Sequence, residues 1–322
     1  MEKILRQGQF VVTGELSPPQ GNDTRVVKRK ADFLKGYVDA ANVTDNLNGI
    51  VRMSSLAASS LLRQMGLEPV MQVSTRDRNR IAIQSDIFGA TALGIKNLLC
   101  LSGVHQSFGN QIDSKNVYDL DSIQLVDCVR GMCNRGTLLG NQERIDGEIK
   151  LFIGAVANPS ADPLEAHVIR LAKKVKAGAD FIQTSCVYDM SRFNEWMKRV
   201  RDQGIPEKAY LLIGMMPLKS APMARDIQKQ FPGVFVPDVF IERLDKARNP
   251  EEEGIKLCIE QIAILKAMQG IHGIHLMTPD WEEAACRITE GAGLLPRPPI
   301  PLFLKDRVVI RRPPFDMLRT NG

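Results

Sequence analysis

The chain has 322 residues, of which 44% are hydrophobic and 25% charged, a balance typical of a folded soluble protein and not of a disordered or fibrous one. Its formal net charge of +5 arises mostly in 296–322, which holds six basic and two acidic side chains. The nearly neutral remainder argues against a nucleic-acid-binding surface.

Neither a membrane span nor a metal site is indicated. The N-terminus lacks an apolar segment of signal-peptide length, and no stretch approaches the roughly 20 apolar residues that cross a bilayer. We therefore expect a cytoplasmic protein without a membrane partner. The six cysteines lie far apart and form no CxxC pair, which disfavours a zinc or iron–sulfur site.

Short apolar runs alternate with amphipathic helical patterns along the whole chain. The predicted strands are 10–16, 37–43, 69–75, 97–102, 150–156, 180–186, 209–216 and 272–277. The predicted helices are 23–35, 53–66, 78–93, 119–135, 162–177, 189–203, 220–231, a pair within 237–269, and 280–292. Eight β/α units predict a closed (β/α)8 barrel, a TIM barrel. An open doubly wound sheet is disfavoured because no GxGxxG or GxxxxGK[ST] motif is present.

Several positions predict where helices begin and where the barrel ends. Asp189, Ser220 and Asp280 are expected to cap the N-termini of the helices that follow them. The pair within 237–269 adds one helix before the last strand. The barrel domain is expected to cover 1–295, followed by a basic, proline-rich extension over 296–322 that docks either on its own barrel or on a partner subunit.

The stretch VTGELSPP places a carboxylate at the end of the first strand. In this fold the site lies at the carboxyl ends of the strands, so Glu15 is a candidate functional residue. The other strand ends carry mainly hydroxyls and amides, without the His, Asp and Glu ligands of a catalytic metal or the GxSxG motif of a serine nucleophile. Many neutral hydrogen-bonding groups suit a large heteroaromatic ligand, such as a flavin.

Seven motifs at these strand ends resemble, in order, those of the methylenetetrahydrofolate reductase family. They are GELSPP, DAANVTDNLNG, GIKNLLCLSG, VYDLDSIQL, GAVANPSADP, KKVKAGADFIQT and GMMPLKSA, and the resemblance covers about residues 10–295. It implies a flavin-containing barrel, with FAD or FMN, that reduces 5,10-methylenetetrahydrofolate to 5-methyltetrahydrofolate. Glu15 is then the general acid: it protonates N10 of the folate, and the resulting 5-iminium cation accepts hydride from N5 of the reduced flavin.

The resemblance also implies the remaining site residues. Flavin contacts are expected at Thr44, Gln72, Leu101, Ser102, Gly103, Tyr118, Ala155, Asn158 and Lys174. Substrate contacts are expected at Val104, Gln183 and Ser185. Gln72 replaces the His that is frequent in relatives. Val104 stands where the family usually has Asp, and Ser185 where it has Gln, although Gln183 lies on the same face of that strand.

The departures at Val104 and Ser185 concern recognition of the substrate. The electron donor and the assembly are separate questions that the sequence leaves open. ANPSADP is similar to anaerobic and fused relatives, and in acetogenic metabolism such a subunit works with a zinc-containing partner and receives electrons through other proteins. The donor is therefore either NAD(P)H or a partner subunit, and we expect an oligomer or a hetero-complex. The alternative is a non-catalytic or electron-relay flavoprotein subunit of a larger complex.

Overall fold

The computed structural model describes residues 1–141, 143–230 and 234–298. Its centre is a closed parallel barrel in which each strand pairs with the next in chain order and β8 closes onto β1. The strands are β1 (Val11–Leu16), β2 (Ala40–Val43), β3 (Pro69–Ser74), β4 (Asn97–Leu101), β5 (Phe152–Ala157), β6 (Phe181–Cys186), β7 (Tyr210–Met215) and β8 (Gly273–Leu276). The predicted TIM barrel is confirmed.

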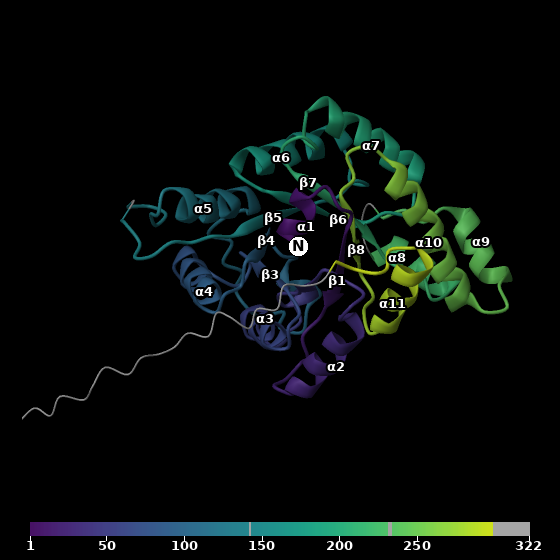
Figure 1. The fold of residues 1–322 in the computed structure, drawn as a ribbon, viewed down its shortest axis with the longest axis horizontal. Helices are drawn as coiled ribbons and strands as arrows, with labels where there is room; N and C mark the ends of the chain where they lie inside the picture. The colour runs from purple at the N-terminus through teal and green to yellow at the C-terminus, as the bar shows by residue number, and fades with distance from the viewer. Residues whose placement is uncertain (142, 231–233, 299–322) are drawn as a thin grey trace, which may run out of the picture.

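The helices form an outer ring around this barrel (Figure 1). They are α2 (Thr24–Leu34), α3 (Ser55–Gln64), α4 (Arg80–Ala92), α5 (Ser122–Asn134), α6 (Leu164–Ala177), α7 (Met190–Asp202), α8 (Ala221–Gln230), α9 (Asp238–Lys246), α10 (Pro250–Ala267) and α11 (Glu282–Gly291). The extra helix predicted before the last strand is α9. Three short elements were not predicted: α1 (Glu2–Arg6) and the 3-10 turns η1 (Leu47–Gly49) and η2 (Gln106–Phe108).

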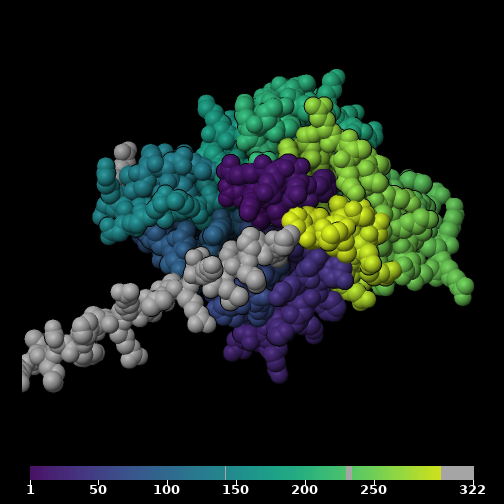
Figure 2. Space-filling view, in the orientation of Figure 1, coloured from purple at the N-terminus to yellow at the C-terminus, as the bar shows by residue number. Residues whose placement is uncertain are grey.

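The barrel interior begins with an apolar layer near the amino ends of the strands. This lower layer contains Val11, Ala40, Val70, Leu99, Phe152, Phe181 and Leu212. Leu5 of helix α1 and Met1, which precedes the helix, pack against it, so the N-terminal segment lies across the centre of this face (Figures 1 and 2). Burial of these side chains closes this end of the barrel and supplies part of its hydrophobic stabilisation.

A polar layer lies above the apolar one. Side chains alternate along a strand, so the residues two positions after members of the lower layer also point inward. This upper layer contains Thr13, Asn42, Gln72 and Gln183, together with His275, which pairs with Thr13 in the register of β1 and β8; all of them are buried. Buried polar groups require hydrogen-bond partners, so the interior of the barrel near the carboxyl ends of the strands is organised by hydrogen bonds and not by apolar packing alone.

Two of the three predicted helix caps are confirmed. The Asp189 carboxylate accepts from the backbone N–H groups of residues 191 and 192, and the Ser220 hydroxyl accepts from that of Met223. The prediction for Asp280 is wrong: its φ is +51°, its carboxylate binds Lys30, and α11 begins two residues later without a side-chain cap. The Asp280 carboxylate binds the buried ammonium group of Lys30 instead of the free backbone N–H groups at the start of α11.

The end of the described chain is fixed at the amino ends of the strands. The Arg297 guanidinium forms an ion pair with buried Asp39, at 3.1 Å from Nε to Oδ1, and donates to the backbone carbonyl of Phe10 at 2.8 Å. The predicted extension over 296–322 lies outside the described residues beyond position 298. No helix in the described ranges is both long and apolar enough to cross a membrane.

Candidate active site

Glu15 lies near the end of β1, at the mouth of the barrel formed by the carboxyl ends of the strands. Its side chain is only 12% exposed. Burial raises the pKa of its carboxyl to about 7, which outweighs the lowering by the positive charges of Lys30 and Arg52; the carboxylate of Glu282 adds to the rise. A carboxyl with this pKa can hold a proton at neutral pH and also release it.

An imidazole from the upper layer stands next to Glu15. His275 Nε2 lies 4.0 Å from Glu15 Oε2, and Nδ1 lies 2.9 Å from the Thr13 hydroxyl. Burial lowers the pKa of His275 to about 3, so the ring is neutral at pH 7 and the contact with Glu15 is not an ion pair. Among the described residues Nε2 has no hydrogen-bond partner. His275 was not predicted from the strand ends; its signal in the sequence was one polar residue within the short apolar run GIHL.

A buried cation holds the loop before α11 close to this site. Lys30 of α2 has a side chain 8% exposed, and its Nζ lies 3.0 Å from Asp280 and 2.7 Å from Glu282. Ion pairing with Lys30 lowers the pKa of Asp280. The same ammonium group provides the largest opposing charge effect on Glu15, so this cluster contributes to the proton affinity of the candidate acid.

A cavity of about 420 Å³ opens over the carboxyl ends of β3 to β6. Seven of the predicted site residues line it: Gln72, Leu101, Ser102, Gly103, Val104, Lys174 and Gln183. Backbone and side-chain donors, apolar walls and cations therefore share one hollow. This is the composition expected of a site for a flat, polar-edged ligand.

Gly103 shapes the wall of this cavity. Its φ is +82°, and a Cβ at this position would lie 3.2 Å from the Cβ of Arg76 and 3.3 Å from that of Ser74. The residue therefore allows a left-handed turn against the end of β3. The nearly buried Arg76 also donates to the backbone carbonyl of Val104 at 3.2 Å, which ties this turn to the loop after β3.

Two cations line the cavity from α6. Lys174 Nζ donates to the backbone carbonyl of Val156 at 2.6 Å, and burial lowers the pKa of Lys174 to about 8. Arg170 lies one turn earlier, with its side chain 49% exposed. Ser122, at the N-terminus of α5, lines the same part of the cavity. The N-terminus of α5 is already capped by the Asp121 carboxylate, which lies 3.8 Å from the Arg170 guanidinium. The two positive groups of α6 suit the phosphate of a nucleotide.

The predicted substrate residues occupy two depths. Gln183 belongs to the buried upper layer, whereas Ser185 lies above it and donates its hydroxyl to Asn158 Oδ1 at 3.1 Å. Asn158 also accepts from the backbone N–H of Ser160 at 3.0 Å. Val104 is 44% exposed, and its isopropyl group carries no charge to the cavity.

Four predicted flavin residues do not line the cavity: Asn158, which accepts from Ser185, and Thr44, Tyr118 and Ala155. Thr44 is fully buried and donates its hydroxyl to Ser17 at 3.3 Å. Tyr118 has a φ of +41° and donates its hydroxyl to the Gly103 carbonyl at 3.4 Å. Ala155 packs in the outer core between strands and helices, and its neighbour Val156 lines the cavity instead.

Ion pairs that were not predicted from the sequence support the cavity rim. Buried Asp45 accepts from Arg78 at 2.7 Å and from the backbone N–H of Ser74 at 2.8 Å. Arg76 pairs with Asp77 at 2.7 Å. The available signal was the alternation of arginines in TRDRNR, directly after the third strand.

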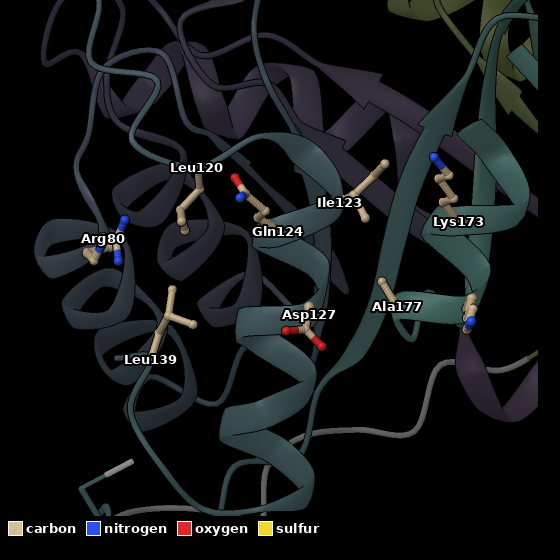
Figure 3. A pocket seen from close by; sticks show the side chains of 9 residues that line it. Arg80, Leu120, Ile123, Gln124, Asp127, Leu139, Lys173 and Ala177 are labelled. Atoms are coloured by element: carbon tan, nitrogen blue, oxygen red, sulfur yellow. The ribbon is translucent and has the colours of Figure 1, made fainter. Parts of the chain in front are cut away.

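A second cavity, of about 610 Å³, lies outside the barrel between α4, α5 and α6 (Figure 3). Its lining includes Arg80, Asp127 and Lys173, and none of the predicted site residues. The Arg80 guanidinium already pairs with Asp119 at 2.8 Å. Within the described parts of the chain, no group of three or more His, Cys, Asp or Glu side chains is arranged to hold a metal ion.

Comparison with known proteins gives a consistent result. The sequence profile described as methylenetetrahydrofolate reductase matches residues 1–293. Methylenetetrahydrofolate reductase 2 of Schizosaccharomyces pombe is 26% identical over 79% of this chain and 40% of its own length. The probable methylenetetrahydrofolate reductase (NADPH) of Caenorhabditis elegans is 23% identical over 91% of this chain and 44% of its own length. The chain thus spans less than half of these curated relatives.

A solved structure shares the fold. It is an uncharacterized protein from Clostridium thermocellum, described as binding two copies of 5-methyl-5,6,7,8-tetrahydrofolic acid. It superposes with a TM-score of 0.62 at 12% identity, covering 89% of this chain and 96% of that one. At this identity the similarity supports the barrel architecture.

Proposed function

We propose, from the premise that this chain belongs to the methylenetetrahydrofolate reductase family, that it reduces 5,10-methylenetetrahydrofolate to 5-methyltetrahydrofolate with a bound flavin. The observation that carries the proposal is the position of Glu15. Its carboxyl, with a pKa of about 7, lies at the mouth of a barrel that also contains a cavity lined by amides, a glycine turn and cations.

The residues around the cavity fit a flavin nucleotide. Gln72, Ser102 and the backbone at Gly103 would hold the polar edges of the ring, and Lys174 and Arg170 would hold a phosphate. When bound, the flavin supplies hydride transfer. A flavin mononucleotide and a dinucleotide both fit this description, because the cations recognise the phosphate that the two share.

Glu15 would hold the proton that the folate requires. In its protonated form it can donate to an amine nitrogen at the barrel mouth, such as N10. The resulting carboxylate is then stabilised by the positive charges of Lys30 and Arg52. The neutral imidazole of His275, held by Thr13, keeps a polar atom within 4.0 Å of the carboxyl without neutralising it.

The proposal is tested by anaerobic spectroscopy on the purified protein. The protein should absorb in the visible range, lose that absorption when reduced with dithionite, and regain it on addition of methylenetetrahydrofolate. Glu15→Gln should retain the flavin and lose the reoxidation. Glu195→Gln, which alters an exposed carboxylate on α7, is the matched control. Absence of flavin, or full reoxidation of the Glu15→Gln protein, would contradict the proposal.

The pH dependence provides an independent check. Protonated Glu15 is the active form, so the rate of reoxidation should fall above about pH 7, by about tenfold per pH unit. Dithionite bypasses the natural electron source. Subsequent trials with NADH, NADPH and co-purifying proteins distinguish a nicotinamide donor from a partner subunit.

Val104 motivates a second candidate, an electron-relay flavoprotein subunit without its own folate chemistry. The position that usually carries Asp here presents an uncharged side chain, 44% exposed, to the cavity. A relay subunit would bind flavin and exchange electrons with its partner, and methylenetetrahydrofolate would not reoxidise it. The same spectroscopic experiment separates the two functions.

A further inference from the structure

Three buried amides form a continuous hydrogen-bonded chain across the barrel. Gln72 Nε2 on β3 donates to Asn42 Oδ1 on β2 at 2.8 Å. Asn42 Nδ2 in turn donates to Gln183 Oε1 on β6 at 2.5 Å. All three side chains are at most 8% exposed. Their chain joins a position expected to contact the flavin to one expected to contact the folate.

Both ends of this amide chain reach the cavity. Gln72 and Gln183 line it, and Asn42 does not. Among the described residues, no group binds the remaining polar atoms, Gln72 Oε1 and Gln183 Nε2. Neither atom is completely enclosed by protein. The amide chain therefore presents an acceptor, Gln72 Oε1, to a ligand at one end and a donor, Gln183 Nε2, at the other.

The hydrogen-bonding direction of Gln72 and that of Gln183 are linked through Asn42, which binds both amides. A primary amide accepts at its oxygen and donates at its nitrogen. If one terminal amide rotated alone, it would place like groups against each other at Asn42, in a buried setting where an unmet hydrogen bond is costly. Reversal of one end is therefore favourable only when the whole amide chain reverses.

We propose that Asn42 couples the two halves of the site, so that the hydrogen-bonding sense of Gln72 and that of Gln183 change together. This inference rests on the proposed function. Reduction of a flavin converts ring nitrogens that accept hydrogen bonds into N–H donors, so a ring held at Gln72 favours one sense when oxidised and the other when reduced. The folate held at Gln183 then meets the Nε2 donor in one redox state of the flavin and the Oε1 acceptor in the other.

Thermodynamic linkage makes this coupling measurable. If the flavin redox state changes the affinity for folate, folate must change the flavin midpoint potential to the same extent. We expect the dissociation constant of 5-formyltetrahydrofolate, which cannot exchange hydride, to differ between oxidised and reduced holoprotein. Couplings of this kind are typically about 5-fold to 150-fold.

The decisive variant is Asn42→Leu, which removes both hydrogen bonds at similar side-chain size. It should retain flavin and reduce the ratio of the two dissociation constants to within about twofold. Asn42→Asp should also lose the ratio, because a carboxylate accepts from both neighbours and cannot transmit polarity. It provides the test if Asn42→Leu fails to fold. Asn97→Leu removes a buried amide that binds Glu68 at the amino ends of the strands, and should keep the wild-type ratio.

Three outcomes separate this inference from the proposed function. A ratio of one in the wild-type holoprotein, or a wild-type ratio in both Asn42 variants, overturns the coupling while methylenetetrahydrofolate still reoxidises the flavin. A chain that takes up no flavin overturns both. A ratio lost in the Asn42 variants and retained in Asn97→Leu supports the coupling, and the folate-induced shift in midpoint potential should disappear with it.

Discussion

Replacing Glu15 by Gln should stabilise the protein above neutral pH while abolishing the proposed reaction. The pKa of this carboxyl rises from an ordinary 4.5 to about 7 because it is buried. Between these values the folded protein holds a proton that the unfolded chain releases, so the free energy of unfolding decreases as the pH rises through this window. At about 1.4 kcal/mol per pKa unit, the penalty reaches about 3 kcal/mol above pH 7 and vanishes below pH 4.5.

Denaturant unfolding of the flavin-free protein measures this penalty. Wild type and Glu15→Gln should differ little at pH 5, and the variant should be about 3 kcal/mol more stable at pH 8. Glu195→Gln should follow the wild type at both values. If wild type and Glu15→Gln show the same pH dependence, burial does not set the proton affinity of Glu15, and the assignment of this residue as an acid at neutral pH is wrong.

Three further substitutions test other contacts. Thr13→Val removes the 2.9 Å partner of His275, and stopped-flow spectroscopy should show about tenfold slower flavin reoxidation at unchanged flavin content. Lys174→Met removes a cavity-lining cation and should weaken flavin binding about tenfold in a fluorescence titration, whereas Lys173→Met, which faces the second cavity, should not. Arg297→Met removes the ion pair of buried Asp39 and leaves this carboxylate with the backbone N–H of Val12 as a partner, so it should lower the unfolding free energy by about 3 kcal/mol in urea. An unchanged value would contradict the role of Arg297 as an anchor.

The barrel was predictable because each strand is a short apolar run bounded by turn residues. The errors have local causes. Residues 37–39 were predicted as part of β2, but Val38 packs in the outer core and pairs only with Lys35 in an isolated bridge. Helix α1 is five residues long, too short for a periodic pattern, and it forms because Met1 and Leu5 cover the lower layer.

The candidate site was predictable where the strand-end rule applies. Glu15 stood out as a carboxylate ending an apolar strand, whereas Gln72 and Gly103 were expected from the resemblance to the family. Asn42 and His275 lie within strands, where polar residues are normally interpreted as satisfied core positions. Their partners come from strands distant in the sequence, so their role depends on barrel closure, which no local pattern reveals.

The upper layer explains how β6 can carry Ser185 where the family resemblance leads us to expect an amide. The Ser185 hydroxyl is already bound to Asn158. An amide is nevertheless present two residues deeper, at Gln183, where a side chain only 6% exposed would be costly without a partner. Asn42 provides that partner. We infer that the amide function on this strand is displaced toward the barrel interior and that Asn42 makes the deeper position tolerable, so Asn42→Leu should affect folate affinity more than Ser185→Ala.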